Sequence, residues 1–343
     1  MLEKPDFADV RIIKLLESHY ALRVRALEFL PVGNDQRAWA YRVEAEAAVY
    51  FLKLRRGGTR PASLIAPHHL KTQGIEQVVA PLETVAGGLL TSAGDYDLIL
   101  YPFIDGRSAW RMAIPPSNWR AWGAIMRRIH SSSLSSHGLD VVEREVFGVK
   151  WLDTLGRVED LLGRGGYRGE VAEAAALVWR DQAVEIMRCR RRYLELGACL
   201  AADPPPFVLC HADIHTANII LDRQSEIRIV DWDETVIAPK ERDLMFFVYD
   251  GHRPEETDAF FAGYGSDEIN WLAMAYYKYD WVVQEFADYG ERIFLSNDIG
   301  VKDLASALNE FKRLFEPDDV IQRAHRAFKR MLREPAFSHI CVG

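Results

Sequence analysis

The sequence has 343 residues, of which 49% are hydrophobic and 27% charged, a balance typical of globular proteins and long enough for two lobes with separate cores. Its formal net charge of −8, with no run of lysine or arginine, argues against a nucleic-acid partner and makes a cationic small molecule a reasonable one. The four cysteines form no C-x-x-C pair, and the N-terminal segment MLEKPDFADV has no apolar core of a signal peptide. No apolar stretch reaches the roughly 18 residues of a membrane span. We therefore expect a cytoplasmic protein with no membrane partner.

The first hundred residues are predicted to form a β-rich region. Their apolar spacing predicts helices over residues 6–19 and 60–74, and Pro67 is expected to interrupt the second helix. Apolar runs predict strands over residues 23–30, 37–44, 48–55, 78–84, 88–93 and 96–104.

The rest of the chain is predicted to be mainly helical. Helices are predicted over residues 117–132 and 170–200 and again from Lys240 onward. Short apolar runs interrupt them at residues 207–210, 218–221 and 227–230. The pattern predicts an α+β protein with a small β-rich N-terminal lobe and a larger helical C-terminal lobe, joined near residues 101–105.

Residues 206–222, PFVLCHADIHTANIILD, change abruptly from apolar to polar. One interpretation is a buried polar network at the end of a strand. A second is a zinc or iron site, because His211, Asp213 and His215 alternate and would share one face of an extended strand. A third is the phosphotransfer pattern H-x-D-x-x-x-x-N, in which the aspartate accepts a hydroxyl proton and Asn218 binds magnesium.

The next segment, IRIVDWDE, favours phosphotransfer. It places Asp231 after a β run, where a rigid backbone can aim a second metal-binding carboxylate. A zinc hydrolase would need more histidines, and the next one, His252, has no partner at ligand spacing. Phosphotransfer also needs a cation on a strand, which Lys53 in VYFLKLR supplies. Gly33, in a turn between two predicted strands, would let the backbone approach a phosphate.

The segments VLCHADIHTANIIL, IVDWDE and APKERDLMF resemble those of the aminoglycoside phosphotransferases, a family with a protein-kinase-like fold. Within that family, AYYKYDWVVQEFADYG, YFLKLR and LYPFI look most similar to the spectinomycin phosphotransferases. The likeness covers most of the chain. It implies a bilobal protein-kinase-like fold, with a nucleotide-binding lobe over residues 1–103 and a catalytic and substrate-binding lobe over residues 104–343.

The resemblance also implies roles for single positions. Asp213 matches the catalytic aspartate, while Asn218 and Asp231 match the magnesium ligands. The residues expected to bind the nucleotide are Lys53, Gly33, Tyr101, Pro102, Phe103 and Ile104. The residues expected to be structural are His211 and Asp243.

One position departs from the kinase pattern. Kinases orient the strand lysine with a glutamate from the following helix. Residues 55–74 contain no Asp or Glu, and the acid of the family would align near Pro61. The sequence leaves open whether Lys53 has another partner, whether the lobe closes differently, or whether the protein is a weak enzyme.

The implied function is transfer of a phosphoryl group from ATP or GTP, with Mg²⁺, to a hydroxyl group of an aminocyclitol or aminoglycoside antibiotic, with spectinomycin as the expected acceptor. Carboxylates and aromatic rings suit such a polycation, and residues 275–290 carry both at helical spacing. The residues expected to contact the acceptor are Asp280, Trp281, Glu285 and Asp288. Two alternatives remain, a metabolic kinase acting on choline, homoserine or a sugar, and a nucleotide-binding protein with little catalysis.

Overall fold

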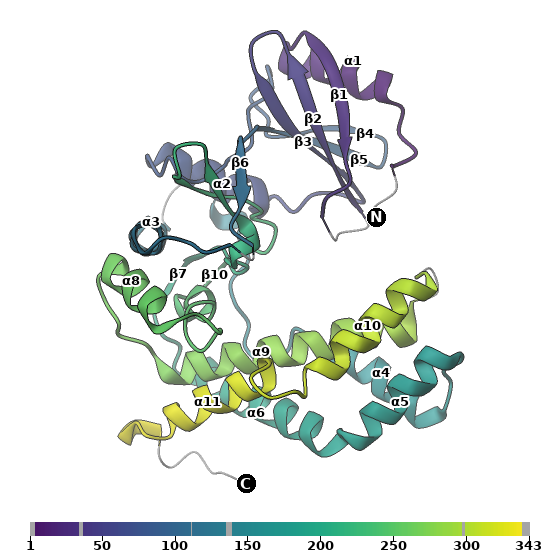
Figure 1. The fold of residues 1–343 in the computed structure, drawn as a ribbon, viewed down its shortest axis with the longest axis vertical. Helices are drawn as coiled ribbons and strands as arrows, with labels where there is room; N and C mark the ends of the chain where they lie inside the picture. Colours follow the sequence, from purple (N-terminus) through teal and green to yellow (C-terminus); the bar gives the residue numbers. More distant parts are fainter. Residues whose placement is uncertain (1–3, 34–36, 111, 135–138, 297–298, 338–343) are drawn as a thin grey trace. The chain divides into compact units, whose positions relative to one another are not determined.

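The computed structural model describes residues 4–33, 37–110, 112–134, 139–296 and 299–337 (Figure 1). The chain divides into two compact units, which we call unit 1 and unit 2. Unit 1 comprises residues 1–143, 208–237 and 258–266. Unit 2 comprises residues 144–207, 238–257 and 267–343. Among the described residues, no helix combines the length and the apolar character that a membrane span requires.

A five-stranded antiparallel sheet begins unit 1. In spatial order its strands are β1 (Val24–Leu30), β2 (Ala38–Ala45), β3 (Val49–Arg56), β5 (Tyr96–Pro102) and β4 (Thr91–Ala93). Helix α1 (Asp9–Tyr20) packs against this sheet and places Ile12 and Leu16 in a common core with the strands (Figure 1).

Strand β3 shows how the sheet sorts its side chains. Leu52 and Leu54 are fully buried in the core shared with α1, whereas the alternate residues Phe51, Lys53 and Arg55 lie on the other face. This alternation gives one charged and aromatic face to a strand whose sequence is otherwise apolar.

A second, three-stranded antiparallel sheet also belongs to unit 1. Its spatial order is β6 (Gly106–Ser108), β8 (Ile219–Asp222) and β9 (Ile227–Ile229). A Cβ atom at Gly106 would collide with the carbonyl oxygen of Leu221, so this close strand pairing requires glycine. Further elements lie wholly or mostly in unit 1: α2 (Ala62–Thr72), α3 (Pro116–His130), η1 (Leu139–Val141), β7 (Phe207–Cys210), η2 (Thr216–Asn218) and α8 (Pro254–Tyr264). Strand β10 (Val236–Pro239) has its first two residues in unit 1 and its last two in unit 2.

Unit 2 is helical. Its elements are α4 (Leu152–Arg164), α5 (Glu170–Asp181), α6 (Ala183–Ala202), α7 (Glu241–Leu244), α9 (Trp271–Gly290), η3 (Glu291–Leu295), α10 (Val301–Arg313), α11 (Val320–Met331) and η4 (Pro335–Phe337). Helix α9 lies alongside α6 and α11 (Figure 1). Tyr276 on α9 stacks on Tyr193 of α6 with ring centroids 5.4 Å apart, and both rings are buried. Because α9 is covered on several sides, most of its side chains face protein.

The predicted α+β fold class is confirmed, because strands dominate the first hundred residues and helices the remainder. The division at residue 103 into a nucleotide-binding and a substrate-binding lobe is a functional one and stays a prediction.

Three sequence-based expectations were wrong. Pro67 does not interrupt α2, because the helix buries a continuous apolar side that offsets the missing backbone donor. Residues 78–84 form only a single bridge from Val78 to Ile229 instead of a strand, since Pro81 cannot donate to a ladder. The helix predicted over residues 170–200 is two helices separated at Gln182, where neither glycine nor proline marks the break.

Candidate active site

Strands β8 and β9 explain why Asn218 and Asp231 are separated by thirteen positions. The strands are antiparallel, with Ile219 paired to Ile229, so that both polar residues stand just beyond the same end of the pairing. The ladder continues by one step, because the Val230 N–H donates to the Asn218 carbonyl at 3.0 Å. A hairpin thus brings an amide and a carboxylate to one edge of the sheet.

His211 connects the loop after β7 to the end of β9. Its imidazole is fully buried, and Nε2 lies 2.9 Å from the Val230 carbonyl oxygen. Because a carbonyl only accepts, Nε2 carries the proton and Nδ1 accepts the Asp213 backbone N–H at 3.3 Å. Both ring nitrogens are engaged with the main chain, which removes one ligand from the zinc or iron interpretation. The contacts suit the structural role predicted for His211.

Ala212 makes the sharp turn between His211 and Asp213. Its φ of 67° lies in the left-handed region, which costs a residue with a Cβ about 1 kcal/mol. On one side of the turn His211 is fully buried, and on the other the Asp213 side chain is 38% exposed. The turn therefore separates an inward-facing anchor from an accessible carboxylate.

The side chain of Asp213 is held by two neighbours. Asn218 donates its Nδ2 to the Asp213 carbonyl oxygen at 2.8 Å and to Oδ2 at 3.0 Å. His215 Nε2 lies 3.4 Å from Oδ1, and because His215 Nδ1 accepts the Ala217 N–H at 3.2 Å, Nε2 carries the proton. A carboxylate oriented in this way can accept a proton from a hydroxyl group brought to it.

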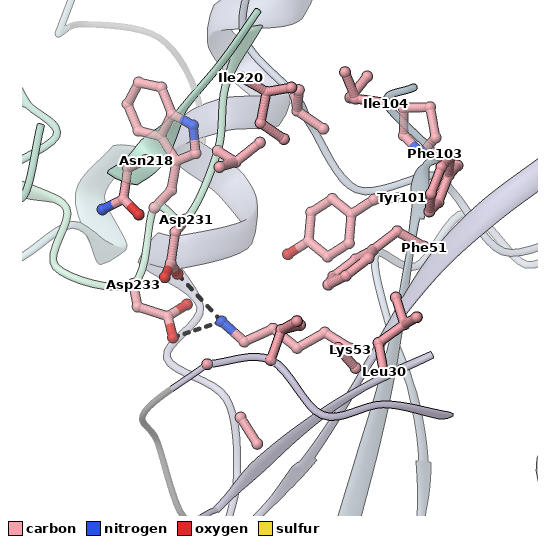
Figure 2. Close-up of a pocket in the computed structure, with 18 of the residues that line it drawn as sticks. Leu30, Phe51, Lys53, Tyr101, Phe103, Ile104, Asn218, Ile220, Asp231 and Asp233 are labelled. Atoms are coloured by element: carbon pink, nitrogen blue, oxygen red, sulfur yellow. Dashed lines mark hydrogen bonds and ion pairs between the residues drawn. The ribbon is translucent and has the colours of Figure 1, made fainter. Parts of the chain in front are cut away.

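Lys53 reaches the same end of the site from β3. Its Nζ lies 3.3 Å from Asp231 and 2.7 Å from Asp233. Dashed lines mark both contacts in Figure 2. Burial alone would lower the pKa of Lys53, but these two carboxylates outweigh burial, and the pKa lies above its ordinary value. Lys53 is therefore a fixed cation, as phosphate binding requires. Asp231 itself has a left-handed φ of 62°.

A cavity of about 420 Å³ in unit 1 contains all of the predicted nucleotide-binding residues. These residues are Lys53, Gly33, Tyr101, Pro102, Phe103 and Ile104. The predicted metal ligands Asn218 and Asp231 line the same cavity. The rings of Phe51, Tyr101 and Phe103 lie across the cavity from Asn218 and Asp231 (Figure 2). An apolar wall facing a small polar end is typical of a site for a flat base that carries charged groups.

Gly33 lines this cavity with a φ of 96°, a conformation that favours glycine. The next residues of the turn, 34–36, lie outside the described residues. The predicted contact of Gly33 with a nucleotide stays a prediction.

In unit 2, Asp280 is an internal residue of α9. It is only 5% exposed and accepts a hydrogen bond from Trp151 Nε1 at 3.0 Å. Burial would lower the pKa of Arg242, but Asp280, foremost among its neighbours, raises it above the ordinary value. This placement favours a structural role for Asp280, whose contact with an acceptor stays a prediction.

Glu145 lies near the same buried group. Burial, and secondarily the charge of Asp280, raises the pKa of Glu145 from 4.5 to about 6. A carboxyl whose folded-state pKa is raised contributes stability below its unfolded pKa and loses that contribution as the pH rises through the folded value. We expect Glu145→Gln to gain stability relative to the wild type as pH rises from 4.5 to above 6, reaching about 1–2 kcal/mol at pH 8. Urea unfolding of both proteins across this range measures the difference, and a difference independent of pH would contradict the expectation.

The other acceptor candidates on α9 are partly exposed. Trp281 donates its Nε1 to Glu285 at 2.8 Å, and Asp288 forms an ion pair with Arg292 at 2.9 Å. Burial raises the pKa of both Glu285 and Asp288. The contact of these three side chains with an acceptor stays a prediction.

Asp243, predicted to be structural, is fully buried in α7. Sequence reasoning missed Asp233, Arg55 and Arg60, which also belong to the site. Arg55 and Lys53 both contact the Asp233 carboxylate, and Arg60 donates to its carbonyl oxygen. The two acids of D-W-D and the two cations of K-L-R, each pair spaced by two residues, were the available signal.

Comparisons with known proteins show which family this chain resembles in sequence and fold. The model of the phosphotransferase enzyme family matches residues 27–277. The spectinomycin phosphotransferase APH(9)-Ia, solved in complex with ADP and spectinomycin, is 26% identical and superimposes with a TM-score of 0.82, covering 95% of this chain and 100% of its own. No curated protein sequence matches this chain significantly.

More distant solved structures share the fold alone. An aminoglycoside phosphotransferase from Alicyclobacillus acidocaldarius is 14% identical, with a TM-score of 0.59 over 96% of this chain and 97% of its own. Choline kinase LicA from Streptococcus pneumoniae is 17% identical, with a TM-score of 0.52 over 95% and 99%. The predicted kinase-like fold and the resemblance to spectinomycin phosphotransferases are both confirmed.

Proposed function

This chain belongs to the phosphotransferase enzyme family, and from that premise we propose that it transfers the γ-phosphoryl group of ATP or GTP to a hydroxyl group of spectinomycin or a closely related aminocyclitol antibiotic. An antibiotic that carries a phosphate dianion no longer fits a site that recognised a polycation. The protein would thereby confer resistance on its host.

The observation that carries the phosphotransfer proposal is the composition of one cavity. Lys53, Asn218 and Asp231 come from segments far apart in the sequence and line the same space. The apolar residues opposite them suit a nucleotide base, and Lys53 suits the phosphates. Structures of APH(9)-Ia have been solved with ADP and with AMP, which supports a nucleotide as the donor.

The donor atoms at the polar end fit magnesium. Mg²⁺ prefers oxygen ligands, and Asp231 offers a carboxylate that is 49% exposed. The Nδ2 of Asn218 is used by Asp213, so its Oδ1 is the atom that would face an ion. When bound, Mg²⁺ would offset the charge of the phosphates.

In this proposal Asp213 orients the acceptor hydroxyl and accepts its proton. The hydrogen bonds from Asn218 hold the carboxylate, and its exposed part remains accessible to a substrate. Lys53 would contact the phosphates of the nucleotide donor and takes no part in proton transfer.

Spectinomycin is proposed as the acceptor on two grounds. APH(9)-Ia matches 95% of this chain at 26% identity, and its complex contains spectinomycin. The partly exposed Glu285, Asp288 and Trp281 on α9 also provide the carboxylates and the aromatic ring that a compact polycation needs.

The test is an ADP-release assay across spectinomycin, kanamycin, choline, homoserine and simple sugars. We expect turnover that depends on spectinomycin and little with kanamycin, accompanied by spectinomycin resistance in a sensitive host. Turnover with choline or homoserine alone would replace the acceptor and leave the kinase assignment standing. Nucleotide hydrolysis that no acceptor stimulates would identify a nucleotide-binding protein with little catalysis.

The acceptor surface is tested by removing its charge. Glu285→Gln and Asp288→Asn should each raise the KM for spectinomycin about ten-fold, the loss expected for one charge-assisted hydrogen bond, with a smaller effect on the nucleotide KM. Glu316→Gln, at an exposed position in unit 2, is the matched control and should change neither constant. Equal changes in both KM values would contradict a direct contact with the acceptor.

A further inference from the structure

The strand lysine of a kinase needs a carboxylate that holds it in place, and here the helix after the strand supplies none. Helix α2 has no acid in its first turn, its N-cap is Pro61, and the residue before the N-cap is the cation Arg60. The start of this helix therefore carries a positive charge and no carboxylate.

Asp233 is the carboxylate that Lys53 contacts most closely. The Oδ2 atom of Asp233 lies 2.7 Å from Lys53 Nζ and 2.9 Å from the Arg55 guanidinium. Lys53 and Arg55 are alternate residues of β3 and share one face, so one carboxylate oxygen can accept from both. Both distances are those of charge-assisted hydrogen bonds.

Arg60 fixes the backbone that carries this carboxylate. Its guanidinium donates to the Asp233 carbonyl oxygen at 2.8 Å and to Glu143 Oε2 at 3.0 Å. The segment just before α2 and the loop after β9 are thereby joined by a hydrogen bond from a guanidinium to a main-chain carbonyl. Kinases link the helix to the lysine directly, whereas here Arg60, which precedes the helix, and Lys53 both contact Asp233.

Asp231 is a poorer candidate for this task. Its carboxylate lies farther from Lys53, at 3.3 Å against 2.7 Å, and is more exposed, at 49% against 32%. A carboxylate that binds a metal ion also shares its charge with that ion and so holds a lysine amine less strongly. Figure 2 shows both carboxylates beside Lys53. With Asp233 holding Lys53 and Arg55, Asp231 can bind an ion while the lysine stays in position.

We propose that Asp233 is the positioning residue for Lys53 and replaces the helix glutamate of other kinases, with Arg60 holding Asp233 in turn. This inference rests on the proposed function, since Lys53 is positioned for nucleotide phosphates. The partner of Lys53 that the sequence left open is thereby assigned.

The first test compares Asp233→Asn, Asp233→Glu and the neighbouring exposed control Glu234→Gln in the ADP-release assay. Asp233→Asn should raise the nucleotide KM about 10- to 100-fold, with the acceptor KM and the magnesium requirement within about two-fold. Asp233→Glu should recover most of the loss, and Glu234→Gln should match the wild type. A magnesium requirement that rises with the nucleotide KM would make Asp233 a metal ligand and overturn the proposal.

The second test asks whether Asp233 acts through Lys53. In a Lys53→Met background, Asp233→Asn should add less than about a two-fold change in nucleotide KM. Without nucleotide, the Tm losses of the two single variants should sum to more than the Tm loss of the double variant. Effects that simply add would overturn the proposal. If the wild type bound no nucleotide, the proposed function would fail, and the nucleotide-free Tm values would still decide whether Lys53 and Asp233 act as a pair.

Discussion

Asp213→Ala should lower the rate of phosphoryl transfer by about 10²–10⁴-fold, the range typical for removing a general base. The carboxylate acts on the acceptor hydroxyl, so nucleotide affinity should stay close to that of the wild type. The structure gives a reason why the transfer rate should fall while nucleotide affinity is kept. Asn218 donates to the main-chain carbonyl of Asp213 at 2.8 Å as well as to its carboxylate, so it keeps a partner after the side chain is removed.

The measurement pairs single-turnover kinetics with nucleotide binding by calorimetry on the same preparation. A Tm close to that of the wild type shows that the loop after β7 is intact, since His211 still bonds to the Val230 carbonyl. Turnover near the wild-type rate would remove Asp213 from the chemistry altogether.

Asp231→Asn should raise the magnesium concentration needed for nucleotide turnover by at least about 10- to 100-fold, because even residues that only support metal ligands have effects of that size. The change keeps the shape of the side chain and removes the charge that faces the ion. The position of Lys53 should be preserved, since Asp233 holds the same amine at 2.7 Å. The defect should therefore appear in the magnesium titration.

Titrating magnesium at saturating nucleotide measures this requirement. Excess magnesium should restore part of the rate, whereas no concentration of magnesium should restore Asp213→Ala. An unchanged requirement would mean that the metal is bound by other residues.

The local part of the site was predictable from the sequence. The spacing of Asp213 and Asn218 is a short-range pattern, and the position of Asp231 after an apolar run fixes it at the end of a strand. A hairpin is the shortest way to join two such runs, and it brings both metal-ligand candidates to one edge. Lys53 was identifiable because it is the lysine of an otherwise apolar strand pattern, VYFLKLR.

The partner of Lys53 was not predictable, because it lies 180 residues away and depends on how separate segments of unit 1 fold together. Helical spacing likewise placed Asp280 and Asp288 on one face of α9. It did not indicate which end of that face other helices bury. Neighbouring helices bury Asp280 beside Trp151, whereas Asp288 remains partly exposed. Periodicity describes one helix, and burial is decided by the helices that pack against it.

The left-handed turn at Ala212 limits how this loop can vary among descendants of the gene. A single base change in an alanine codon reaches glycine, valine, threonine, serine, proline, aspartate or glutamate. Glycine adopts a φ of 67° without strain and aspartate tolerates it, whereas valine and threonine are strongly disfavoured there and proline is excluded. Drift at this position should therefore run towards glycine, and the branched residues should be depleted even though the methyl group of Ala212 itself performs no chemistry.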